Sequence, residues 1–103
     1  MELRVMAPGD DLKDQDIDLI EKDLGKIDKR LVSYDLVRAD VRIAQNGSTA
    51  KKVTLEVHYG RQHVMAKAEH QKLGQAVRAA RDDVLRQIND RSRGGHSSFT
   101  KGR

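Results

Sequence analysis

The sequence has no cysteine and no tryptophan, and it contains one proline, one phenylalanine and two tyrosines. Without cysteine the chain can form neither a disulfide framework nor a thiolate metal site. With so few aromatic rings, aliphatic side chains must supply most of the core, and stacking of unpaired bases on rings is disfavoured. No stretch approaches the roughly 18 apolar residues that cross a membrane, and no signal segment opens the chain. We therefore expect a cytoplasmic protein that does not associate with membranes.

The excess of positive charge is unevenly distributed along the chain. The 103 residues correspond to a single domain and include 20 Lys and Arg against 16 Asp and Glu, a net charge of +4. Residues 1–35 carry 6 basic and 10 acidic side chains, residues 36–69 carry 6 and 3, and residues 70–103 carry 8 and 3. A basic excess confined to the second and last thirds favours an anionic partner. A solvated charged surface is the alternative.

Two segments have the period of an amphipathic helix. The first spans about residues 12–32, and aspartates before and within its first turn suit the positive end of the helix dipole. Its apolar stripe consists of Ile17, Ile20, Leu24, Ile27 and Leu31. The second helix spans about residues 70–92, with a stripe of Leu73, Val77, Ala80, Val84 and Ile88. We expect its arginines at 78, 81 and 86 to point away from that stripe.

Four segments alternate apolar and polar residues, as half-buried strands do. They are residues 2–7, 36–45, 52–59 and 62–69, separated by turn signals at Pro8-Gly9, Asn46-Gly47 and Gly60. A right-handed first crossover makes the first two strands parallel, and the others form an antiparallel meander. The predicted fold class is α+β, in the order β-α-β-β-β-α, with a four-stranded mixed sheet and two helices packed on one face. The exposed sheet face would carry Arg38, Arg42, Lys52, His58 and Lys67.

The domain organisation follows from where the second helix ends. We expect residues 1–93 to form one α+β domain. The glycines and serines that follow, with Lys101 and Arg103, indicate a flexible basic tail over residues 94–103.

No catalytic or cofactor-binding pattern is present. The glycines do not form a phosphate-binding G-x-x-x-x-G-K-[ST] loop, and no acid, base or nucleophile set is apparent. His58 and His63 can approach each other across the Gly60 turn, but surface histidines on a polar strand face are the interpretation we favour over a metal site. We therefore predict no enzyme, no cofactor, no metal and no small-molecule substrate, with a site built from scattered polar groups as the alternative.

The functional prediction rests on the basic side chains, because those of each helix share one face of that helix. Lysines of the first helix follow the spacing i, i+4, i+7, and arginines of the second follow i, i+3. A planar guanidinium binds phosphate through two N–H groups, so several together favour RNA. The predicted RNA-binding residues are Lys22, Lys26, Lys29, Arg30, Lys67, Arg78, Arg81, Arg86 and Arg91. The alternative is that aspartates of the second helix engage its arginines in ordinary surface pairs.

Three local patterns stand in order along the chain. They are Ile20-Glu21-Lys22-Asp23-Leu24-Gly25-Lys26-Ile27, Val64-Met65-Ala66-Lys67-Ala68-Glu69-His70 and Leu85-Arg86-Gln87-Ile88. Together with the element order, over about residues 2–91, they resemble the ribosome hibernation-promoting factor family, which includes the ribosome-associated inhibitor protein Y. Lys26, Lys29 and Arg86 match the basic surface of that family.

The resemblance implies a protein that binds small-subunit rRNA in the decoding channel. There it would block mRNA and tRNA binding during stress or stationary phase. The implied partners are the small ribosomal subunit and its rRNA, and we expect a monomer when free. Gly74 departs from the family, which often has an aromatic residue there. The chain resembles a short-form factor or the N-terminal domain of a long one.

Two other classes of function fit the same layout. One is a general RNA-binding module for double-stranded or structured RNA. The other is a protein-interaction domain that associates through the sheet.

Overall fold

The computed structural model describes residues 1–7, 12–46 and 50–92. Its elements are β1 (Glu2–Met6), α1 (Asp14–Arg30), β2 (Val37–Asn46), β3 (Ala50–Tyr59), β4 (Gln62–His70) and α2 (Leu73–Ser92). Every predicted helix and strand is present, with ends that shift by a few residues. The predicted break at Pro8-Gly9, the turn at Gly47 and the tail over 94–103 lie outside the described residues.

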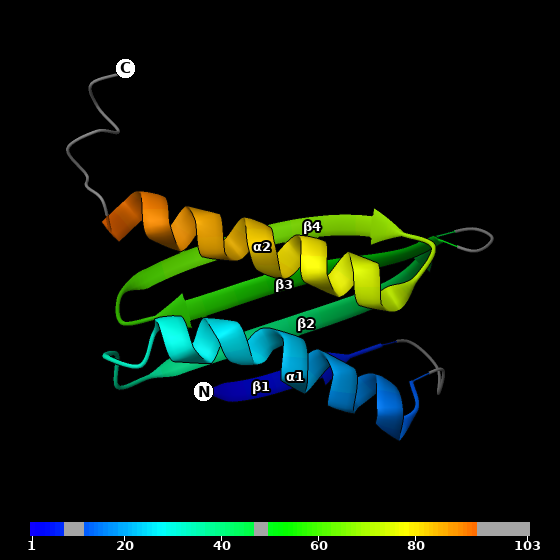
Figure 1. The fold of residues 1–103 in the computed structure, drawn as a ribbon, viewed down its shortest axis with the longest axis horizontal. Coiled ribbons are helices and arrows are strands. Elements are labelled where there is room, and N and C mark those ends of the chain that lie inside the picture. The colour runs from blue at the N-terminus through cyan, green and yellow to red at the C-terminus, as the bar shows by residue number, and fades with distance from the viewer. Residues whose placement is uncertain (8–11, 47–49, 93–103) are drawn as a thin grey trace, which may run out of the picture.

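The strands form one sheet in the order β1-β2-β3-β4. β1 is parallel to β2, and the pairs β2–β3 and β3–β4 are antiparallel. Both helices cover the same face, with α2 over β3 and β4 and α1 beside it toward β1 (Figure 1). The α+β prediction, including the parallel first pair and the single covered face, is confirmed.

The core lies between the sheet and the two helices. Both predicted helix stripes point into it, because helical periodicity places residues three and four apart on one side. Its fully buried side chains include Ile20, Leu24, Ile27 and Leu31 from α1 and its C-terminal cap, and Val77, Ala80, Val84 and Ile88 from α2. Val41, Leu55 and Val57 meet them from the sheet. In the described part of the chain, no element covers the opposite sheet face, which we call the open face.

Two glycines allow close approaches that position the surface features. Gly60, with a φ of 59°, forms the short turn between β3 and β4, where a side chain would be strained. This turn sets the register in which His58 pairs with His63. At Gly74, a Cβ atom would lie 3.3 Å from the Cδ2 atom of Leu19, so the glycine lets the start of α2 pack against α1. A larger side chain at position 74 would require the Leu19 side chain to move.

Candidate RNA-binding surface

Three lysines are exposed on the outer side of α1. The helix begins after Lys13, whose backbone N–H donates a hydrogen bond of 3.1 Å to the Asp16 carboxylate. Since the apolar stripe faces the core, the spacing places Lys22, Lys26 and Lys29 on the opposite side. All three are exposed, and none has a hydrogen bond or ion pair with another described residue. Their ammonium groups are therefore available to an anionic partner.

Acidic residues of α1 are partly separated from Lys22, Lys26 and Lys29, which we call the lysine row. Glu21 and Asp28, seven residues apart, share the helix edge that faces β1. Asp28 Oδ1 lies 3.4 Å from the N-terminal amino group of Met1. This arrangement leaves the lysine row without a carboxylate from the described residues within ion-pair distance.

Arg78 and Arg86 add positive charge from α2. Arg78 Nε lies 3.5 Å from Asp23 Oδ2, and Arg86 Nη2 donates a 2.6 Å hydrogen bond to Asp83 Oδ1. Their side chains are 56% and 72% exposed. The exposed Arg86–Asp83 pair contributes only about 0–1 kcal/mol, and Asp23, which is 12% exposed, keeps Arg81 beside it when Arg78 turns to another partner. Both guanidinium groups can therefore exchange a carboxylate for an RNA phosphate at little cost.

Arg81 does not point away from the apolar stripe, so that expectation was wrong. The residue is only 9% exposed and lies in the contact between the helices. Its Nη1 atom is 3.7 Å from Asp23 Oδ1, and its Nη2 atom donates a 2.8 Å hydrogen bond to Asp82 Oδ1. A nearly buried guanidinium needs such partners, because an unpaired buried charge is strongly destabilising. Arg81 joins α2 to α1 and offers little surface to RNA.

Arg30 and Arg91 lie at the end where both helices terminate. Arg30 donates hydrogen bonds to Asn89 and Ser92, and Arg91 donates one of 2.7 Å to Gln62. The two arginines line a cavity of about 70 Å³ together with the Tyr59 side chain. Burial raises the pKa of Tyr59, whose hydroxyl has no hydrogen-bond partner among the described residues. Both arginines therefore tie chain segments together at this end of the fold.

Lys67 lies on the open face of the sheet, away from the helices. That face carries charges of both signs, since Arg38 pairs with Asp40 and Arg42 pairs with Glu56 at 3.5 and 3.6 Å. A hydrogen bond from His63 to the carboxylate, together with the nearby cations, lowers the pKa of Glu56. Among the nine predicted residues, five are exposed on the two helices, on sides turned away from the apolar stripes: Lys22, Lys26, Lys29, Arg78 and Arg86. We call these five residues the basic helix face.

Sequence reasoning missed the importance of Asp23 and Glu56. Asp23 is the α1 partner of both Arg78 and Arg81, although nothing in its local pattern distinguishes it from its acidic neighbours. Glu56 does carry a signal, because it precedes His58 by two residues on an alternating strand and therefore shares its face. Neither helix in the described part of the chain is long and apolar enough to cross a bilayer.

The comparison with protein families decides the identity. A family model described as sigma 54 modulation protein / S30EA ribosomal protein matches residues 4–93. The chain belongs to this family. The match covers nearly the whole described fold and confirms the resemblance to hibernation-promoting factors drawn from the sequence patterns. The S30EA family is one of ribosome-associated factors and is not an enzyme class.

Solved structures share the S30EA fold. The crystal structure of the Thermus thermophilus protein Y N-terminal domain superposes with a TM-score of 0.75 at 21% identity, covering 85% of this chain and 96% of that one. A ribosomal subunit interface protein from Coxiella burnetii gives a TM-score of 0.79 at 18% identity, covering 91% and 100%. No curated protein matches the chain by sequence.

Proposed function

We propose that this S30EA-family chain is a translation inhibitor that binds small-subunit rRNA in the decoding channel and blocks mRNA and tRNA there during stress or stationary phase. Its membership of a family of ribosomal proteins supports the ribosome as partner. A structural neighbour is itself described as a ribosomal subunit interface protein. The single observation that carries the mode of binding is the exposed lysine row of α1, which has no partner among the described residues.

The proposed mechanism is steric occlusion. The helix layer is rigid because its inner side packs on the sheet and the Asp23–Arg81 contact joins the two helices. Such a body can exclude mRNA and tRNA by its volume alone, with no reacting group. Lys22, Lys26 and Lys29 contact rRNA phosphates, and Arg78 and Arg86 exchange their aspartates for phosphates.

This mechanism predicts binding that weakens steeply with salt. Each neutralised phosphate releases bound counterions, so about five contacts give a log–log slope of about −4. Affinity for small subunits should therefore fall by about two orders of magnitude between about 50 and about 200 mM salt. Co-sedimentation with purified small subunits over a salt series measures this. Absence of association at the lowest salt would end the proposal.

A competition experiment distinguishes the proposed function from the alternative, a general RNA-binding module. In the same co-sedimentation, free duplex RNA at a concentration equal to that of the subunits should leave the bound fraction unchanged. Displacement by the duplex would favour general double-stranded RNA binding. A protein-interaction domain would instead bind neither RNA nor subunits at any salt.

A further inference from the structure

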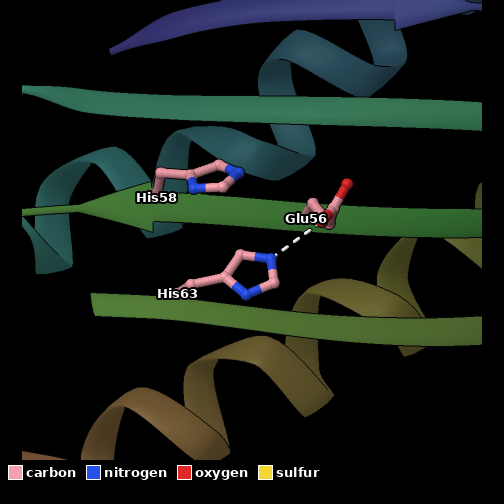
Figure 2. A group of neighbouring side chains, drawn as sticks. All are labelled: Glu56, His58 and His63. Carbon is pink, nitrogen blue, oxygen red and sulfur yellow. Dashed lines mark hydrogen bonds and ion pairs between the residues drawn. The ribbon is translucent and has the colours of Figure 1, made fainter. Parts of the chain in front are cut away.

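Three potential metal ligands gather on the open face of the sheet, away from the basic helix face. Glu56 and His58 come from β3, and His63 comes from β4 (Figure 2). Residues two apart on a strand point to the same side, which explains why Glu56 and His58 are neighbours. The register places His63 directly opposite His58, just beyond the turn at Gly60. The backbone therefore fixes all three side chains in one place.

The side chains already lie close to the spacing that a metal requires. One ligand atom from each residue lies within 4.8 Å of the others, and His63 Nε2 is 2.8 Å from Glu56 Oε2. The two imidazole rings stack with centroids 4.5 Å apart. In a tetrahedral zinc site with bonds of about 2.0–2.1 Å, neighbouring ligand atoms are about 3.3 Å apart. Side-chain rotations alone can close the remaining difference, because the His63 side chain is 46% exposed.

We propose that Glu56, His58 and His63 form a site for a divalent transition metal, with zinc as the best match. Two imidazoles and one carboxylate are a ligand set that zinc favours, and a water molecule would take the fourth position. Zinc binds the lone pair of His63 Nε2 when the ring hydrogen is on Nδ1, so a neutral ring changes tautomer on binding and a protonated ring releases one proton. The sequence alone predicted no metal site, because it did not reveal that Glu56 lies beside the two histidines.

The surrounding positive charges lower the affinity of the site for a metal ion, but they do not block it. Arg42 Nη1 lies 3.6 Å from Glu56 Oε1, whereas His63 contacts the other oxygen, Oε2. Arg42 can therefore stay in place while Oε2 binds the metal, although its positive charge repels a dication. Arg38 is already paired with Asp40. A metal held here would join β3 to β4 beside their turn.

The test is calorimetric titration of the full chain with zinc chloride in a non-chelating buffer. Every protein carries His96→Ala, which leaves His70 as the one histidine outside the cluster. We expect one zinc per chain, and affinity reduced by about tenfold or more in His58→Ala and in His63→Ala. His70→Ala is the matched control and should bind like the parent, while Arg42→Ala should bind more tightly.

Thermal unfolding provides a second measurement that does not depend on heats of binding. Zinc at about ten times its Kd should raise the Tm of the parent by about 5 °C, because a ligand of the folded state stabilises it. The same zinc concentration should raise the Tm of His63→Ala by about 2 °C or less, and circular dichroism without zinc checks that this variant folds. Absence of one-to-one binding, or equal zinc affinity in His63→Ala and His70→Ala, would overturn the proposal.

Discussion

Reversing the three lysines of α1 should abolish binding to the small ribosomal subunit. In the variant Lys22→Glu, Lys26→Glu, Lys29→Glu we expect an affinity loss of about 100-fold or more, and a salt slope reduced by about three. The reason is that each lysine is exposed and lacks a partner in the described structure, so its interaction energy is available to a phosphate. Co-sedimentation over a salt series measures both quantities.

A matched variant separates this effect from a change in overall charge. Lys52→Glu, Arg61→Glu, Lys67→Glu alters the net charge equally, at exposed positions of β3, β4 and the turn between them, away from the basic helix face. It should lose far less affinity, because only the general electrostatic attraction is reduced. Equal losses in the two variants would show that total charge, and not the α1 surface, governs binding.

Removing Arg81 should destabilise the fold, whereas the same change at Arg86 should not. Arg81→Ala leaves Asp23, whose side chain is 12% exposed, without its contact to the buried guanidinium and opens a gap between the helices. Loss of one partner from a buried pair costs about 3–5 kcal/mol, and the part exposure here lowers the expected loss to about 2–4 kcal/mol. Arg86→Ala removes only an exposed pair with Asp83 and should cost less than about 1 kcal/mol.

Urea unfolding followed by circular dichroism gives both free energies of unfolding. Arg81→Met helps to interpret them, since methionine restores apolar contact but no charge. It should recover the part of the stability that comes from packing, and leave the loss that comes from breaking the Asp23–Arg81 contact. If Arg81→Ala were as stable as Arg86→Ala, the Asp23–Arg81 contact would not join the helices as described.

The fold could be predicted because periodicity alone encodes it. Ile20, Leu24 and Ile27 recur at helical spacing and are buried, and the alternation around Val41 and Leu55 gives the inward face of the sheet. Right-handed crossover then fixes β1 parallel to β2. At these positions the local sequence pattern agrees with the packing in the folded protein. The pattern alone was therefore enough to predict the elements and their buried faces.

The candidate site was less predictable, because ion pairing between helices is a tertiary property. Arg81 lies at the border of the apolar stripe, and its charge suggested solvent. Its burial depends on Asp23, which is 58 positions away in the chain and belongs to another helix. Lys26 and Lys29 were easier to predict, since they lie opposite the stripe. The sequence likewise indicated the approach of His58 and His63, but only the side-chain geometry shows Glu56 within hydrogen-bond distance of His63.

The most direct test of the account is the structure of this chain bound to the small ribosomal subunit, determined by electron cryo-microscopy. We predict density in the decoding channel, with the outer side of α1 and α2 against rRNA phosphates and the open face of the sheet turned away from them. Lys22, Lys26 and Lys29 should each lie within ion-pair distance of a phosphate, and mRNA should be absent. Density at another site on the subunit, or contact made through the open sheet face, would contradict the account.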